Sequence, residues 1–222
     1  MLIDLFLAFN DCSELLTYVS KLGLDVAGIR SDVLELCLDQ LPQLQRSVAI
    51  VPRCIHESTQ RSLLPPRREL RRCLPLCIPS DLQTARSLAK VSQSVVIALN
   101  VETLKFVDET QVNFMATSKV RKFIEVLLEP FIELARIDSK RMSLERALHF
   151  VGETIERCLK LDVGIFVSSY SPSIKRVLHP IHIDVLLQSL GFTKRERRLV
   201  LQVYPLEALR SWLGEEGWIR LR

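Results

Sequence analysis

Seven short apolar segments of strand length recur along this chain, separated by longer stretches with helical periodicity. They span residues 3–9, 26–29, 48–51, 74–78, 95–99, 123–128 and 163–167. Their nearly continuous apolar character is typical of strands buried on both faces, as in a parallel sheet covered by helices. Strands and helices alternate, so the pattern predicts a parallel sheet built from right-handed βαβ crossovers.

Helical periodicity is found at residues 13–22, 31–38, 81–91, 143–161 and, more weakly, 101–106. Two further helices are expected after the last strand, ending at 204–209. Thr193 and Glu196 have the spacing of a capping box, in which a hydroxyl and a carboxylate each accept from a free backbone N–H at a helix start. Gly23 and Gly191 follow helical segments, where glycine adopts the left-handed conformation of a C-terminal cap without strain.

The length of 222 residues suits one (β/α) barrel, and a core of that volume needs no disulfide or metal to stabilise it. We therefore predict an α/β fold, a TIM-like (β/α) barrel formed by residues 1–222 as a single domain. Seven strands leave open whether an eighth exists or one unit is incomplete, and an open doubly wound sheet is the rival architecture. The polar insertion 55–69, with its two adjacent prolines, is expected to be a surface loop or a broken helix.

The start of the chain and its cysteines both indicate a cytoplasmic protein. No apolar run reaches the roughly 18 residues that would span a bilayer, and the apolar start lacks the leading positive charge of a signal peptide. We therefore expect no membrane partner. The six cysteines are scattered among apolar neighbours, so we expect reduced, buried thiols and no disulfide framework.

Arginine is concentrated in two parts of the sequence. Six arginines and two glutamates lie between Pro52 and Cys73, a local charge of +4 that equals the formal net charge of the chain. Residues 194–198 contain four more basic residues and one glutamate. The guanidinium fork matches phosphate oxygens, so these stretches indicate phosphates or an acidic partner. Two solvated faces are the simpler interpretation.

The sequence offers few candidates for catalysis or cofactor binding. It contains only seven glycines and neither a GxGxxG nor a GxxxxGK pattern, which argues against a glycine-rich phosphate loop. No acid, base or nucleophile is grouped at a spacing that catalysis requires. Cys54, His56, Cys73 and Cys77 could together bind zinc, but no Cys-x-x-Cys knuckle is present, and buried thiols are the favoured interpretation.

Two polar motifs lie at and after the carboxyl end of the last predicted strand. Ser168 and Ser169 end that strand, where barrels place their sites, and their hydroxyls could bind a phosphate or cap the next turn. His179 precedes Pro180, and proline suits the first helical turn. We therefore expect His179 to cap a helix or contact a phosphate rather than to act in catalysis.

The last third of the chain resembles the ribonuclease P protein component 3 family, the thirty-kilodalton subunit of archaeal and eukaryotic type. The resemblance rests on a strand ending in the serine pair, a turn with two basic residues, a proline-led helix, a break at Gly191, and a final helix with Tyr204 and Pro205. Weaker agreement extends over nearly the whole chain, at 4–9, before 80–82 and at 123–127.

The fold of this family is similar to the polymerase and histidinol phosphatase barrel, whose metal enzymes carry Asp-x-His-x-His on the first strand. The corresponding residues here are Asp4, Phe6 and Ala8. Phenylalanine and alanine cannot ligate a metal, so the resemblance implies a barrel that keeps its shape without a catalytic metal centre. We therefore predict no catalytic residue and no metal ligand in this chain.

The resemblance implies a protein subunit of ribonuclease P, the endoribonuclease that removes the 5′ leader of precursor tRNA. The RNA and its magnesium ions would cut the phosphodiester, while this chain would bind and stabilise the catalytic RNA and hold no cofactor itself. Family membership also implies component 2 as a protein partner, in a heterotetramer, with precursor tRNA contacted indirectly. The basic stretches give the expected RNA contacts, which are Arg67, Arg68, Arg71, Arg72, Lys175, Arg176, Arg195 and Arg198.

Two alternatives remain open at this point. One is a metal-dependent phosphoesterase of the polymerase and histidinol phosphatase type, which would need histidine and carboxylate ligands at the strand ends. The other is a scaffold whose basic faces bind an acidic protein.

Overall fold

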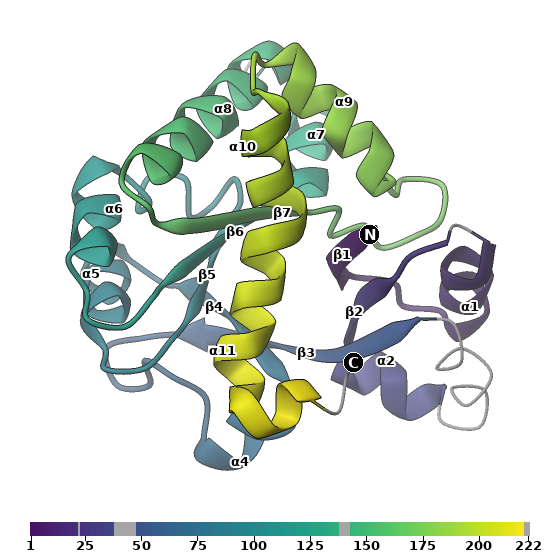
Figure 1. The fold of residues 1–222 in the computed structure, drawn as a ribbon, viewed down its shortest axis with the longest axis horizontal. Coiled ribbons are helices and arrows are strands. Elements are labelled where there is room, and N and C mark those ends of the chain that lie inside the picture. The colour runs from purple at the N-terminus through teal and green to yellow at the C-terminus, as the bar shows by residue number, and fades with distance from the viewer. Residues whose placement is uncertain (22, 38–47, 138–142, 220–222) are drawn as a thin grey trace.

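A sheet of seven strands forms the centre of the molecule (Figure 1). The structure is a computed structural model and describes residues 1–21, 23–37, 48–137 and 143–219. The strand order is β1-β2-β3-β4-β5-β6-β7, and every neighbouring pair is parallel. All seven predicted strands are present. They are β1 (Ile3–Leu7), β2 (Val26–Arg30), β3 (Ala49–Ser58), β4 (Leu74–Pro79), β5 (Val96–Leu99), β6 (Phe123–Leu127) and β7 (Gly164–Ser168).

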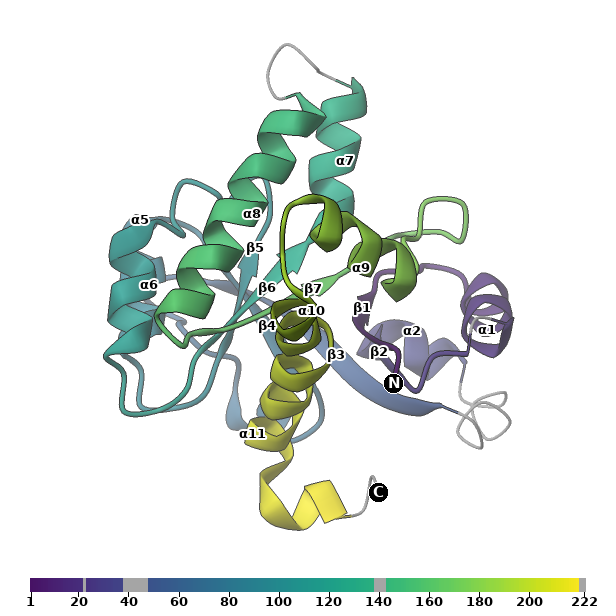
Figure 2. The same ribbon diagram turned by 45° about the horizontal axis from the view of Figure 1, so that its top comes forward.

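The sheet curls into a barrel that nearly closes between its first strand and the segment after its last. The backbone N–H of Tyr170 donates to the carbonyl of Phe6 at 2.9 Å, and that of Ala8 donates to the carbonyl of Ser171 at 3.1 Å. The described residues contain no eighth strand. The fold is therefore an α/β, TIM-like barrel, as predicted (Figures 1 and 2).

Helices cover the outside of the sheet. Figures 1 and 2 show α5, α6 and α8 on one side of the barrel and α1 and α2 on the other. Among the described residues, no helix is both long enough and apolar enough to cross a membrane. The bounds are α1 (Cys12–Lys21), α2 (Ser31–Leu36), α4 (Arg67–Leu70), α5 (Leu82–Lys90), α6 (Glu109–Ala116), α7 (Leu128–Ile137), α8 (Leu144–Lys160) and α9 (Pro180–Ser189).

The hydrophobic core has two parts that follow this arrangement. The larger part includes strand residues such as Leu76, Ile97 and Phe166 and the inner faces of the later helices. The smaller part lies between the first two strands and their helices, where Leu15 and Tyr18 of α1 are buried. Because β6 and β7 are buried along their whole length, their apolar pattern has no polar alternation.

A long helical rod crosses the barrel at the end of the chain. The predicted capping box begins it: the Thr193 hydroxyl accepts from the N–H of Glu196 at 3.3 Å, and the Glu196 carboxylate accepts from the N–H of Thr193 at 2.7 Å. Near the other end, the indole N–H of Trp212 donates to the carbonyl of Leu70 at 2.7 Å. The rod therefore runs from the end of α9 to α4 (Figure 1). Its parts are α10 (Lys194–Arg198), the π-helical turn η1 (Leu199–Val203) and α11 (Tyr204–Ile219).

Several helix and loop predictions are wrong. Strand β3 continues to Ser58 through the start of the expected insertion 55–69, because its last residues pair with β4, and α4 begins within the same insertion. Residues 101–106 form turns, whereas α6 and α7 were not expected. The last helix begins at Tyr204 instead of ending near it. Residues 22 and 38, the predicted ends of two helices, lie outside the described residues.

The expectation of six reduced cysteines is also wrong. Four of them form two disulfides, each with its Cα atoms 5.7 Å apart, a usual separation for this bond. One bond joins the first two helical segments, and the other joins the neighbouring strands β3 and β4. The pairs are Cys12–Cys37 and Cys54–Cys73, and the buried free thiols are Cys77 and Cys158.

Candidate nucleic-acid interface and barrel interior

A buried ion pair occupies the barrel interior. Arg53 of β3 and Glu125 of β6 contact each other directly, and both side chains are completely shielded from solvent. Glu125 also accepts a 2.5 Å hydrogen bond from the hydroxyl of Ser168 at the end of β7. The guanidinium of Arg53 lies 4.9 Å from the centre of the Phe6 ring. The two charges thus compensate each other inside the barrel, as full burial requires.

Asp4 of β1 is a second buried acid in this region. Its Oδ1 accepts from the backbone N–H groups of Phe6 at 3.1 Å and Ser169 at 3.3 Å, while its Oδ2 has no hydrogen-bond partner among the described residues. Burial raises the pKa of Asp4 to about 7, against the opposing effect of hydrogen bonds from Ser169 and Phe6, and the Glu125 carboxylate adds to the rise. Asp4 therefore keeps its proton to a higher pH than an exposed aspartate does.

The donors that a metal centre needs do not converge in this structure. Within the described ranges, no group of three or more His, Cys, Asp or Glu side chains could hold a metal ion. Phe6 of β1 and Ala8, directly after that strand, have side chains that cannot ligate a metal. Phe6 packs edge-on against Tyr170, with ring centres 5.0 Å apart. An aromatic pair and an ion pair therefore fill the space in which ligands would be required.

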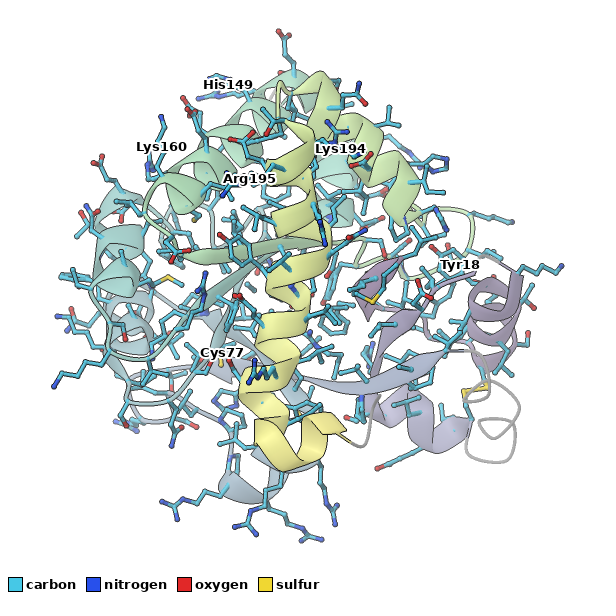
Figure 3. The ribbon with its side chains drawn as sticks, viewed as in Figure 1. Tyr18, Cys77, His149, Lys160, Lys194 and Arg195 are labelled. Atoms are coloured by element: carbon cyan, nitrogen blue, oxygen red, sulfur yellow. A yellow bond between two sulfur atoms is a disulfide. The ribbon has the colours of Figure 1, made fainter. Side chains whose placement is uncertain are left out.

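The four candidate zinc ligands are held in separate surroundings. Cys54 and Cys73 are joined to each other. Burial raises the pKa of the Cys77 thiol to about 11, and Figure 3 shows this residue within the body of the molecule. The Nε2 atom of His56 lies 3.0 Å from the carbonyl of Ser62, in hydrogen-bonding contact. These side chains therefore do not form one site.

The polar motifs after β7 have structural roles. His179 caps α9, since its Nδ1 accepts from the N–H of Ile181 at 3.2 Å, and Pro180 is the first residue of that helix. Ser168 and Ser169 are both buried and serve the interior, through Glu125 and Asp4 respectively. The capping role expected of His179 is confirmed, whereas the serine pair does not reach the surface.

The first group of exposed cations lies on and beside α4, and we call it the α4 cluster: Arg67, Arg68, Arg71 and Arg72. All four side chains are exposed. None of them makes an ion pair or a hydrogen bond with another side chain in the part of the chain that the structure describes. Figure 3 shows long side chains at α4 extending away from the body of the molecule. Their charges are therefore available to an external anion.

The second group, the α10 cluster, consists of Lys194, Arg195 and Arg198 at the start of the rod, and all three are exposed. Figure 3 shows Lys194 and Arg195 near the upper end of the molecule. The fourth cation of this stretch, Arg197, is bound internally, with its Nε 2.8 Å from the Asp184 carboxylate. The capping box of Thr193 fixes the start of α10, the helix that carries these cations.

The basic turn before α9 differs from both clusters. Lys175 is exposed. Arg176 reaches two acids of α7, with its Nη1 3.3 Å from Glu129 and 3.1 Å from Glu133. Much of the Arg176 charge is therefore compensated within the protein.

The rod fixes the distance between the two clusters. Arg195 and Trp212 are 17 positions apart along the rod, which at a rise of about 1.5 Å per residue is about 25 Å. Because Trp212 bonds to Leu70 of α4, the α4 cluster lies beside one end of the rod and the α10 cluster at the other. The sequence did not predict that the rod connects the two clusters.

The fold and these surfaces together define a class of protein: a TIM-like α/β barrel that holds a buried ion pair in its interior and carries two clusters of exposed cations on and beside its outer helices. Protein-family models and curated protein sequences give no match to this chain.

Among solved structures, the chain is similar to one in the cryo-EM structure of archaeal ribonuclease P with mature tRNA, with a TM-score of 0.67 and 12% sequence identity. The similarity covers 93% of this chain and 90% of that chain. At this level of identity the likeness is one of fold.

Proposed function

We propose that this chain is a protein subunit of ribonuclease P that assists RNA-catalysed removal of the 5′ leader from precursor tRNA. The observation that carries the proposal is the similarity of fold, over 93% of this chain, to a chain from an archaeal ribonuclease P with mature tRNA. The residue pattern of the last third of the sequence supports the same choice and favours component 3 as the particular subunit.

The role of the chain in this proposal is electrostatic. The α4 cluster and the α10 cluster offer exposed cations near opposite ends of the rod, whose axial length from Arg195 to Trp212 is about 25 Å. Cations at two such distant places neutralise phosphates at distant points of a folded RNA and favour its compact, catalytic form. Lys175 and Arg176 add a third region of contact. Base reading within RNA helices is limited, because their deep major groove does not admit side chains.

In this proposal the RNA of the holoenzyme, and not this chain, carries out the cleavage reaction. The RNA and its magnesium ions cleave the phosphodiester, and the chain itself binds no cofactor and has no catalytic residue. Component 2 is the proposed protein partner, in a heterotetramer, and precursor tRNA is contacted indirectly. The proposed compartment is the cytoplasm, although the two disulfides remove the argument for it that was based on reduced cysteines.

The alternative of a metal-dependent phosphoesterase gains no support from the geometry. Such an enzyme needs convergent histidine and carboxylate ligands at the strand ends. The interior acid Glu125 is instead neutralised by Arg53, and Phe6 packs on Tyr170. We therefore do not propose this activity.

The proposal is tested by reconstituting precursor-tRNA cleavage from ribonuclease P RNA and the protein subunits, with and without this chain. We expect the chain to raise the cleavage rate and to lower the magnesium concentration that half-maximal cleavage requires. An unchanged rate and an unchanged magnesium requirement would refute the assignment.

The electrostatic mechanism has its own test in the salt dependence of RNA binding. Each arginine that contacts a phosphate contributes about 0.7–0.9 to the slope of log K against log salt. Replacing Arg67 and Arg68 by glutamine should therefore flatten the slope by up to about 1.8. The control is Arg146→Gln, an exposed arginine on α8. Equal effects per charge at both places would show that the α4 cluster has no special role, and binding that salt does not weaken would favour an acidic protein as partner.

A further inference from the structure

A cavity of about 450 Å³ lies at the amino-terminal ends of β4 and β5, beside the α4 cluster. Its volume falls in the range of about 300–1,000 Å³ that is typical of small-molecule pockets. This end of the barrel is opposite to the carboxyl end, where barrel enzymes place their catalytic residues. Neither Arg53 nor Glu125 lines the cavity. Its floor is apolar and consists of Leu70, Leu74, Pro75, Val95, Val96, Val120 and Ala208.

One side of the cavity is a polar turn formed by Ser92, Gln93 and Ser94. The buried Lys122 holds this turn in place, because its ammonium group donates to the carbonyls of Val91, at 2.7 Å, and Gln93. The hydroxyl of Ser94 donates to the carbonyl of Arg121 at 3.0 Å. The side chains of Ser92 and Gln93 are exposed and available for hydrogen bonds. The polar rim is therefore fixed before any ligand arrives.

The opposite side of the cavity carries an aromatic ring. Trp212 of α11 lines the cavity and is half-buried. Its indole N–H is already bonded to the carbonyl of Leu70, so the ring has a fixed orientation and no free donor. A flat ligand can still stack on such a ring, and RNA bases commonly stack on aromatic side chains in this way.

Exposed cations flank two of the lining residues in the sequence, and one exposed acid, Glu69, precedes Leu70. Arg71 and Arg72 follow the lining residue Leu70, and both are exposed. Lys119 precedes the lining residue Val120 and is exposed as well. An apolar cavity with a polar rim and flanking cations matches a nucleotide, which has a flat base and a phosphate on each side. A neutral side chain of a partner protein would leave these cations unpaired, whereas the phosphates on either side of an inserted base each carry a negative charge.

We propose that this cavity receives one unpaired RNA base, turned out of its helix and stacked on Trp212, while the neighbouring phosphates contact the α4 cluster. The inference rests on the proposed function. It adds a contact between the cavity and a base that forms only where the RNA has an unpaired nucleotide. The chain then distinguishes a bulged or looped nucleotide from a continuous helix without reading a long sequence. Ser92 and Gln93 are placed to bond the edge of the base.

The test compares two fluorescently labelled RNA duplexes that differ only in a single bulged uridine. Binding to the full chain is followed by anisotropy. We expect the bulged duplex to bind about tenfold more tightly, as stacking of one base on an aromatic side chain allows. Equal affinity of the wild-type chain for both duplexes would overturn the proposal.

Two variants and a control make the result specific. Trp212→Leu removes the stacking ring, and Ser211→Leu narrows the cavity from an exposed lining position without removing the bond to Leu70. Both should abolish the preference for the bulge, and Ser211→Leu, which keeps the bond between Trp212 and Leu70, should leave the affinity for the continuous duplex unchanged. The control is Ser189→Leu, an exposed serine of α9 away from the cavity. A full bulge preference in Ser211→Leu would overturn the proposal even if Trp212→Leu failed to fold.

The outcomes also separate this inference from the proposed function. If the bulge preference is absent but precursor-tRNA cleavage still depends on the chain, the cavity proposal fails and the subunit assignment stands. If cleavage does not depend on the chain, the subunit assignment fails, whatever the bulge preference. If Ser211→Leu weakens assembly with a protein subunit and leaves RNA binding unchanged, the cavity belongs to a protein contact and the proposal is overturned.

Discussion

Replacing Asp4 by asparagine should stabilise the protein, and the gain should grow as the pH rises. The folded state raises the pKa of Asp4 from 3.8 to about 7, chiefly by burial. The unfolded chain therefore loses this proton at lower pH than the folded chain does. Stability consequently falls as the pH rises between about 4 and 7, because the folded state must keep a proton that the unfolded state has released.

The size of the effect follows from the two pKa values. Each pH unit between them corresponds to about 1.4 kcal/mol, so ionisation of Asp4 costs about 1.5 kcal/mol of folding free energy at pH 5 and about 4 kcal/mol at pH 8. Asparagine does not ionise, and its carbonyl can still accept from Phe6 and Ser169. The difference in unfolding free energy between Asp4→Asn and the wild type should therefore increase by about 2–3 kcal/mol from pH 5 to pH 8.

Urea denaturation at several pH values measures this difference. The control is Asp11→Asn, because Asp11 is exposed and backbone N–H groups of Glu14 and Ser13 lower its pKa. Asp11 is then ionised in both states above pH 5, so its substitution should shift stability by a constant amount across the range. A difference for Asp4→Asn that is equally constant, or that shrinks as the pH rises, would refute the argument from burial.

Three further predictions concern stability and use the same assay. Arg53→Leu alone should lower the free energy of unfolding by about 3–5 kcal/mol, because it leaves Glu125 buried and unpaired. The double variant Arg53→Leu with Glu125→Leu should lower it clearly less. Equal losses in the two variants would show that the pair is not coupled. Thr193→Ala should cost about 1 kcal/mol through loss of the capping box, and no loss would mean that the rod does not depend on this cap. Cys54→Ser should cost about 2–4 kcal/mol in oxidising buffer; the cost should largely disappear in reducing buffer, and a cost independent of redox conditions would refute the bond to Cys73.

The barrel could be predicted from the sequence because its strands are buried on both faces. A segment such as residues 123–127 has no regular polar alternation, and its alternation with helical segments along the chain favours a covered parallel sheet. The second half of β3 was missed for the opposite reason. His56 and Glu57 are polar and lie next to the exposed Ile55, so this extension resembles a loop although it pairs fully with β4.

The interior ion pair could have been found from the sequence, whereas the disulfides could not. Glu125 stands between Ile124 and Val126 in an apolar strand, and a charge at such a position must have a buried partner. No comparable signal connects Cys54 with Cys73, because their proximity arises only when β3 and β4 pair in register. The same is true of the cavity beside Trp212, whose lining residues come from five separate parts of the chain.

The seam between β1 and the segment after β7 has a consequence for the newly made chain. Asp4 and Ser169, which meet across this seam, are 165 positions apart. The ribosome must therefore synthesise about three quarters of the polypeptide before the first strand gains its second neighbour. Until then β1 presents an open edge, which is a template for unwanted pairing with other chains. Slowing translation just before residue 169 should thus promote aggregation more than an equal pause near the end of the chain.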